Sequence, residues 1–405
     1  MKQIKDQLYD FSFIDLFSGI GGFHQAMTQL GGHCVLASEI DENCTRVYEN
    51  NYHMKSAVNI RDLDEKEIPD HDVLCAGFPC QAFSKAGKQA GLKDKTRGTL
   101  FFEVERILRA KHPEYIVLEN VRNLVSHDHH NTWNTIQAVL RDCGYRLTAE
   151  PLILSPHQFG IPQLRERVII LGKYDPQHIE TPLYIPLDAH RKKDENSIYD
   201  IVSPEPVDDK YTLSPYEIKV LDAWDEFYQG IDRKVIGFPI WADYFHYETI
   251  PSEYPGWKQE FVRKNIELYR RNQTFIDGWL ERYNQLADFT PTHHKMEWQA
   301  GTKISSLWEG VIQMRPSGIR VKTPTCFPAL VAMVQIPIIG RYRRRLTVEE
   351  AGRLQSFPNP CRTLTATNES AFLCDDNDQQ AYKQFGNSVN VEVIRQCALS
   401  LFANN

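Results

Sequence analysis

Residues 13–22 read FIDLFSGIGG, and this stretch decides the expected fold. Residues 13–17 predict a buried strand, and residues 23–30 predict a helix. Glycines between a strand and a helix allow the backbone of the turn to approach a ligand closely. The stretch therefore predicts the first βα unit of an α/β sheet.

The first 175 residues repeat this alternation. Further strands are expected at residues 34–38, 72–75, 115–118, 147–154 and 167–171, and helices at 42–51, 99–110 and 132–142. Strands and helices that alternate at this spacing predict a doubly wound, mostly parallel sheet.

The alternation is lost between about residues 176 and 345, where Pro, Trp, Tyr and charged residues are frequent and one long helix is expected at 258–287. This change predicts a second, smaller and less regular domain, which suits a chain of 405 residues. Helices are expected again at 347–354 and 390–402. We therefore expect domains at 1–185 and 186–345, with 346–405 packing on the first.

Composition narrows the class of protein. The chain is 42% hydrophobic and 24% charged, and no apolar run approaches the roughly 18 residues that a membrane span needs. Residues 1–10 resemble neither a signal peptide nor a transit peptide. None of the nine cysteines forms a CxxC pair, so we expect no disulfide framework and no metal site. A reducing cytoplasm fits best.

A basic block interrupts this chain of net charge −7. Residues 300–345 hold one acid, Glu309, and eight basic residues: Lys303, Arg315, Arg320, Lys322, Arg341, Arg343, Arg344 and Arg345. Such a block can bind phosphates or can form a solvated surface strip, and composition leaves both interpretations open.

A cysteine follows the third expected strand, in residues 76–84, AGFPCQAFS. Cys80 would lie beyond the carboxyl end of that strand, where parallel sheets bind ligands, and Pro79 would fix the backbone before it. A lone cysteine is more often a small buried apolar residue. The stretch 85–98, with its glycines and lysines, favours instead a loop that closes over a substrate beside a nucleophile.

Charged residues follow other expected strands. Glu39 ends the second strand, where a carboxylate could accept hydrogen bonds from ribose hydroxyls. Glu119 ends the fourth, where partial burial would raise its pKa and suit it to hold or deliver a proton, although a helix cap or surface carboxylate would look the same. Arg165 and Arg167 would share one strand face, where they could hold a phosphate and favour a thiolate.

These motifs occur in a fixed order along the chain. The order is Phe-x-Gly-x-Gly from Phe17, then Pro-Cys-Gln, Glu-Asn-Val, Gln-x-Arg-x-Arg, and QFGNSV at residues 384–389. In this the sequence closely resembles the DNA cytosine-5 methyltransferase family, especially enzymes of bacterial restriction–modification systems. The likeness covers residues 11–175 and 345–400.

The resemblance implies a class I, Rossmann-like methyltransferase that uses S-adenosylmethionine. It implies that Cys80 adds to carbon 6 of cytosine, so that carbon 5 becomes nucleophilic enough to take a methyl group. Glu119 would bind at N3 of the base. Arg165 and Arg167 would lie near the cytosine O2 and the phosphate.

The resemblance also implies a cofactor site. Its residues would be Phe17, Gly19, Gly21, Gly22, Glu39, Ile40, Asn59, Ile60, Pro79, Leu100, Asn387 and Val389. Asn59 stands where the family often has Asp. Asp62 is therefore a rival for the contact with the adenine amino group.

Double-stranded DNA is the implied partner, with the target base flipped out of the duplex to reach Cys80. The middle of the chain matches the family's target-recognition region in placement only, and Ala329-Leu330 stands where members often have Thr-Leu. We expect DNA contacts from Gln81, Ser84, Arg315, Arg320, Lys322, Arg343, Arg344 and Arg345.

The resemblance further implies a monomer whose cognate restriction endonuclease acts on the same site without direct contact. Two alternatives compete with it. A tRNA cytosine-5 methyltransferase would share the scaffold but usually has a compact middle with a Cys-Phe-Thr element, unlike Cys326-Phe327-Pro328 here. A non-catalytic DNA-binding regulator would be free to lose Cys80 or Glu119, and both are present.

Overall fold

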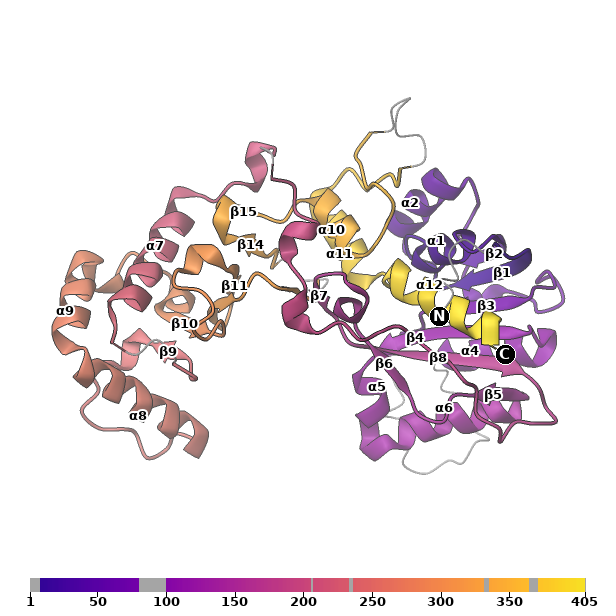
Figure 1. Cartoon of the computed structure of the whole chain (residues 1–405), viewed down its shortest axis with the longest axis horizontal. Coiled ribbons are helices and arrows are strands. Elements are labelled where there is room, and N and C mark those ends of the chain that lie inside the picture. The colour runs from indigo at the N-terminus through magenta and orange to yellow at the C-terminus, as the bar shows by residue number, and fades with distance from the viewer. Residues whose placement is uncertain are drawn as a thin grey trace. The chain divides into compact units, whose positions relative to one another are not determined.

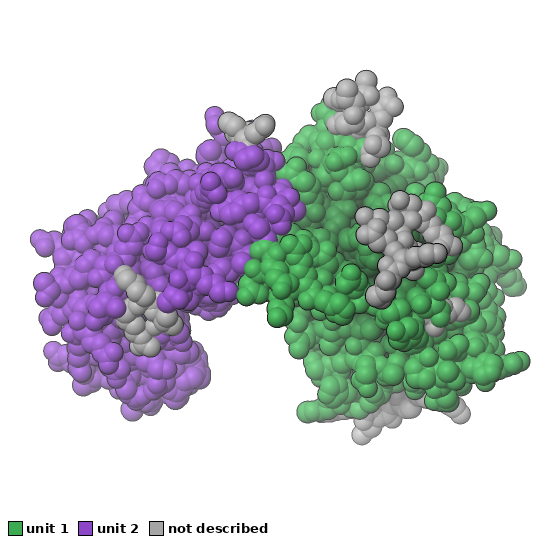
Figure 2. Space-filling model, in the orientation of Figure 1, with its two compact units in different colours: residues 1–196, 329–332, 348–405 green, residues 197–328, 333–347 purple. Residues whose placement is uncertain are grey.

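The structure, a computed structural model, describes residues 8–79, 100–204, 207–232, 236–330, 335–363 and 371–404. The chain divides into two compact units (Figure 2). Residues 1–196, 329–332 and 348–405 form the first unit, and residues 197–328 and 333–347 form the second.

A seven-stranded sheet organises the first unit. Its strands are β1 (Phe11–Leu16), β2 (Gly32–Ser38), β3 (Val73–Ala76), β4 (Tyr115–Val121), β5 (Tyr145–Leu147), β6 (Leu152–Leu154) and β8 (Arg167–Tyr174). The order is β2-β1-β3-β4-β8-β5, and β6 also pairs with β8. The pairs among β1 to β4 are parallel, whereas β8 runs antiparallel to β4, β5 and β6. The α/β class is confirmed, with a parallel half that carries the expected strand-end loops.

The strand expected at 147–154 is wrong in one respect, because two short strands, β5 and β6, replace it. Pro151 lies between them. Proline has no N–H to donate to a strand ladder, so the strand is interrupted there.

Helices cover both faces of the sheet (Figure 1). They are α1 (Gly22–Thr28), α2 (Glu42–Tyr52), α4 (Leu100–Lys111), α5 (Asn123–Ser126), α6 (Asn131–Asp142), α10 (Val348–Leu354), α11 (Asp378–Asn387) and α12 (Val391–Asn404). Ile14 of β1 packs in one core cluster with Phe101 of α4 and Ile136 of α6. Phe11 points to the other face, with its ring 5.2 Å from that of Phe402 in α12. The sheet is therefore doubly wound.

The second unit is more regular than its sequence pattern indicates. Its six-stranded sheet has the order β15-β14-β11-β12-β10-β9. These strands are β9 (Ile240–Trp241), β10 (Lys295–Trp298), β11 (Val311–Arg315), β12 (Gly318–Lys322), β14 (Ile338–Ile339) and β15 (Arg344–Arg345). Each is two to five residues long, too short for a recognisable alternation.

Three helices pack with that sheet around Trp224 and Trp279, which are fully buried: α7 (Pro215–Gly230), α8 (Gly256–Arg271) and α9 (Gln273–Arg282). The single helix expected at 258–287 is therefore wrong, because the chain leaves helical geometry at Asn272, between α8 and α9. The Asn272 amide donates to the Leu268 carbonyl and accepts from the Asp232 N–H, so it competes with the helix backbone. Within the described ranges, no helix is long and apolar enough to cross a membrane.

Candidate active site

The segment that leads to the expected nucleophile is fixed at the carboxyl edge of the parallel strands. Gly77, Phe78 and Pro79 follow β3 directly, while Cys80, Gln81 and Ser84 lie outside the described residues. Asn120, which is buried at the end of β4, donates to the Phe78 carbonyl over 2.7 Å. The Asn120 side-chain oxygen accepts from the Val121 N–H over 2.8 Å. One side chain thus ties the loop after β3 to the end of β4.

Glu119 lies next to this loop. Its Oε2 is 3.9 Å from the position that a Cβ on Gly77 would take. Its Oε1 is 3.0 Å from Nε of Arg167, and only 13% of the Glu119 side chain and 23% of the Arg167 side chain are exposed. Burial raises the pKa of Glu119, although the charges of Arg167 and Arg165 oppose the shift. A carboxyl group that keeps its proton more readily than usual is suited to donate one.

Arg165 does not share a strand face with Arg167. β7 (Gln163–Leu164) ends before Arg165, and β8 begins only at Arg167. Arg165 is 3% exposed, and its guanidinium donates to three main-chain carbonyls rather than facing open solvent. Burial lowers the pKa of Arg165 to about 9, which leaves it protonated at neutral pH. Arg165 and Arg167 were expected to be an equivalent pair on one strand face, but they lie in different surroundings.

A small cavity lies between these groups. Glu119, Arg165 and Arg167 contribute to its walls, together with Leu154 and Val389. Ionisable groups beside apolar side chains are typical of the wall of a ligand site.

The glycine turn between β1 and α1 has the backbone that its sequence predicts. Gly19 and Gly21 have φ angles of 55° and 86°, the left-handed region that glycine enters without penalty. Phe17 also has a positive φ, 57°, which costs a residue with a side chain about 1–3 kcal/mol. Nothing lies within 4 Å of the position that a Cβ on Gly19 would take, so the turn has open space above it.

Glu39 joins this turn to the loop after β2. Its Oε2 accepts from the Gly19 N–H over 2.9 Å, and its Oε1 accepts from Ile40 and Asp41 N–H groups over 2.7 and 2.9 Å. A carboxylate has about four acceptor positions, so one on Oε2 stays available for a ligand hydroxyl. Ile40 is 73% exposed beside it, which suits contact with the face of a purine.

The C-terminal motif, residues 384–389, packs against the same glycine turn. A Cβ on Gly22 would stand 2.5 Å from Oγ of Ser388 and 2.7 Å from Cγ2 of Val389, so only glycine allows this approach. Val389 is buried and Asn387 is exposed. The structure thus brings together two motifs that are more than 350 residues apart in the sequence.

The other expected cofactor residues differ in exposure. The side-chain oxygen of Asn59 accepts from the Arg61 N–H over 3.1 Å. This bond holds the side-chain amide of Asn59 in one orientation. Both Asn59 and Asp62 are exposed, whereas Ile60 is buried. Leu100, the first residue of α4, is half-buried, and Pro79 is exposed.

Comparison with known proteins agrees with this geometry. Residues 11–403 match the family model of the C-5 cytosine-specific DNA methylases. The chain belongs to this family. It is 33% identical to the type II methyltransferase M.AluI of Cellulosimicrobium cellulans over 95% of this chain and 90% of that protein. It is 36% identical to M.HpaII of Haemophilus parainfluenzae over 95% and 87%. These relatives do not favour an RNA methyltransferase or a non-catalytic regulator.

Solved structures share the fold of this methylase. A DNMT2 variant from Spodoptera frugiperda has a TM-score of 0.53 at 21% identity, covering 97% of this chain and 100% of that one. The Dnmt2 methyltransferase of S. pombe has a TM-score of 0.52 at 18% identity, covering 97% and 99%. The Rossmann-like fold class is confirmed.

The basic block of this methylase is less available to DNA than its sequence suggests. Arg320 pairs with Glu297 (2.6 Å between Nη2 and Oε2), and Arg345 pairs with Glu217. Arg344 is 4% exposed and donates to the Ser203 carbonyl over 2.8 Å. Acids and a carbonyl elsewhere in the chain already bind these three arginines, so their expected DNA contacts stay predictions that require these partners to be exchanged.

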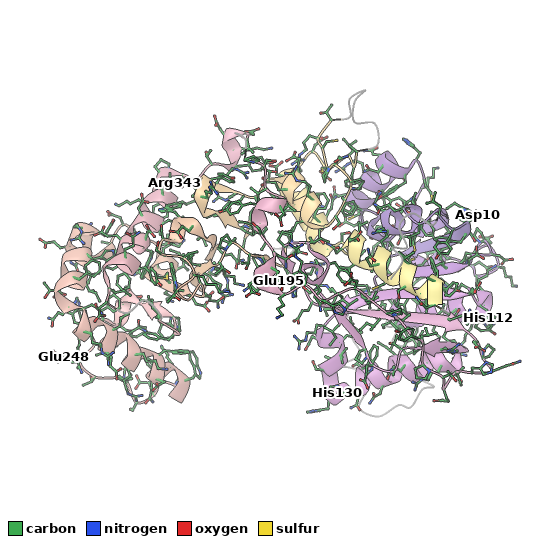
Figure 3. All side chains as sticks on the ribbon, viewed as in Figure 1. Asp10, His112, His130, Glu195, Glu248 and Arg343 are labelled. Atoms are coloured by element: carbon green, nitrogen blue, oxygen red, sulfur yellow. The ribbon has the colours of Figure 1, made fainter. Side chains whose placement is uncertain are left out.

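The other expected DNA contacts in the block differ in exposure. Arg343 is exposed at the surface of the second unit (Figure 3), with its guanidinium 4.3 Å from the ring centre of Trp308 and 3.8 Å from Asp222. Arg315 is half-buried, and its Nη1 has no hydrogen-bond partner in the described part of the chain. Lys322 is also half-buried. Of the six basic residues expected to contact DNA, Arg343 is the exposed one and therefore fits that expectation best.

Sequence reasoning missed the support beneath the glycine turn. Tyr52 donates to the Gly21 carbonyl over 3.0 Å, and its ring is stacked on that of His24 with centroids 3.8 Å apart. Asp15 is fully buried and accepts from the His24 N–H over 3.3 Å, as a substitute for the side-chain cap that Gly21 cannot give α1. The Asp-Leu-Phe motif could have indicated Asp15, but no sequence signal links Tyr52 to the turn.

Proposed function

We propose that this methylase transfers a methyl group from S-adenosylmethionine to carbon 5 of a flipped-out cytosine in duplex DNA, through a covalent bond to Cys80. The proposal is supported above all by Glu119, a buried carboxyl group with a raised pKa. It lies beside the loop that leads to Cys80 and is bonded to Arg167.

Cys80 activates the base. Its thiolate adds to carbon 6, and the electron pair of the 5,6 double bond then makes carbon 5 nucleophilic enough to take the methyl group. Removal of the carbon 5 proton, by a water or another base, reforms the double bond and expels the thiolate. The enzyme thus ends the cycle in its starting state.

Glu119 holds a proton at N3 while Cys80 adds to carbon 6, and so neutralises the negative charge that the addition places on the ring. Arg167 orients the Glu119 carboxyl through the 3.0 Å contact and lines the same cavity, where the cytosine O2 would lie, while its Nη1 donates to the Glu166 carbonyl. The low exposure of both side chains strengthens these interactions relative to water.

The glycine turn fits S-adenosylmethionine, which supplies the methyl group. Glu39 would accept from a ribose hydroxyl, Ile40 and Phe17 would contact the adenine, and Asn387 and Val389 would line the methionine end. The open space at Gly19 and the free acceptor position on Glu39 Oε2 support this assignment. The adenine amino group would meet Asn59 or Asp62.

Recognition of the DNA sequence belongs to the second unit. Residues 197–328 and 333–347 carry Lys303, Arg341 and Arg343, the exposed members of the basic block. The relatives M.AluI and M.HpaII are type II methyltransferases by name. We infer that the chain is a modification enzyme of a restriction–modification system, and we propose that it acts as a monomer and that a cognate restriction endonuclease reads the same site without direct contact.

A mechanism-based trap tests the proposal. DNA with 5-fluorocytosine at the target position should form a stable covalent complex in the presence of S-adenosylmethionine, because fluorine cannot leave as the proton does. Cys80→Ser should abolish both the complex and methylation while DNA binding persists. An adduct that survives in Cys80→Ser would identify another nucleophile, and the proposal would then fail.

A further inference from the structure

Arg165 is a buried cation with no acid bonded to it in the described part of the chain. Its Nη1 donates to the carbonyls of Gly386 over 2.8 Å and Leu330 over 3.2 Å, and its Nη2 donates to the Ser388 carbonyl over 2.9 Å. A buried charge is costly unless it is compensated, so these three bonds hold their carbonyls firmly in place.

Two of the three carbonyls that Arg165 binds, those of Gly386 and Ser388, belong to the end of α11 and the residue that follows it. This segment packs against the glycine turn so closely that a Cβ on Gly22 would stand 2.5 Å from Oγ of Ser388. A shift of Ser388 by about half an ångström would therefore change the packing of the glycine turn.

We propose that Arg165 is a positioning residue that fixes the segment Gly386–Ser388 against the glycine turn and thereby sets the affinity for the cofactor. This inference rests on the proposed function, because it takes Asn387 and Val389 as part of the cofactor site. It differs from the expectation that Arg165 contacts the base or a phosphate.

The guanidinium is suited to this task by its shape. It is planar, and its N–H groups diverge in a fixed fork, so it can hold several carbonyls at once with little loss of entropy. A lysine at 165 would keep the charge, but its single ammonium group cannot reproduce the two separate Nη positions. Arg165→Lys therefore keeps the positive charge at this position but loses the hydrogen-bond geometry of the guanidinium.

Equilibrium binding of S-adenosylmethionine to the full chain, measured by calorimetry without DNA, tests the proposal. Arg165→Lys should weaken binding by about tenfold or more, the factor that corresponds to loss of one charge-assisted hydrogen bond. Arg122→Lys is the matched control, because Arg122 is 58% exposed and pairs with Glu166 beside Arg165. The control should bind within twofold of the unmodified protein.

Each result of the binding measurement either supports or overturns the inference. Equal affinity of Arg165→Lys and the unmodified protein, at a temperature where both are folded, would overturn the inference. Arg165→Gln, which keeps two N–H donors without the charge, replaces Arg165→Lys if the latter does not fold. If neither variant folds, Arg165 acts on global stability and the inference is also overturned. Failure of the unmodified protein to bind the cofactor would instead contradict the proposed function.

Discussion

Glu119→Gln removes the proposed proton donor with almost no change in shape. The glutamine carbonyl can still accept from Nε of Arg167, which is 3.0 Å from Oε1 in the structure. The substitution also removes a carboxyl group whose desolvation is the main cause of its raised pKa. Loss of the charge-assisted bond and relief of that desolvation oppose each other.

The expected effect of Glu119→Gln on the reaction rate is much larger than its expected effect on stability. A hydrogen bond to a charged group contributes about 1.5–3 kcal/mol, and a neutral one about 0.5–1.5 kcal/mol. The free energy of unfolding should therefore change by no more than about 1.5 kcal/mol. A positioned general acid contributes about 10²–10⁴-fold to rate, so kcat should fall by that factor. Affinity for S-adenosylmethionine should stay within about twofold, because Glu119 is not among the proposed cofactor residues.

The pH dependence gives the prediction a sign. The folded protein holds the Glu119 proton above the ordinary pKa of 4.5, so kcat should fall as pH rises through the raised pKa. The folded state also binds this proton more tightly than the unfolded chain does. The contribution of Glu119 to stability is therefore complete below pH 4.5 and declines as pH rises toward the raised value. Glu119→Gln should lack both effects.

Single-turnover methyl transfer across pH, with thermal melting of both proteins, is the assay. A Glu119→Gln protein that keeps kcat within threefold would show that no proton from Glu119 is needed. An unmodified protein and a variant with the same pH profile would lead to the same conclusion. Loss of activity together with loss of folding would assign Glu119 a structural role only.

Further outcomes follow from the contacts. Arg343→Ala should flatten the slope of log affinity for DNA against log salt by about 0.9. Arg345→Ala should leave that slope unchanged and lower the melting temperature, since Glu217 already binds Arg345. Equal slopes for the two variants would contradict this distinction. Gly22→Ala should cost about 1–3 kcal/mol and weaken cofactor binding, because its Cβ would meet Ser388 Oγ at 2.5 Å, and an unaltered melting temperature would contradict that contact. Grafting residues 197–347 from a relative should move the methylated site in methylome sequencing, and a folded chimera that keeps the parent site would refute the assigned role.

The sequence determined the catalytic half of this protein to a large extent. A glycine turn after a strand, a carboxylate after the next strand and a Pro-Cys pair after the third are local features, each fixed by neighbours in the chain. In a parallel sheet, the carboxyl ends of the strands meet at one edge, so the sequence was enough to predict that Glu119 lies beside the loop before Cys80 and that Glu39 lies beside the glycine turn.

Tertiary structure decided what the charged residues do. Residues 300–345 look strongly basic, yet Glu297 and Glu217, from outside this range, bind Arg320 and Arg345. Arg165 and Arg167 look like a pair, yet one is clamped to carbonyls and the other meets Glu119. A side chain's partner depends on contacts between distant segments, and electrostatic effects depend on burial, so neither can be read from local sequence.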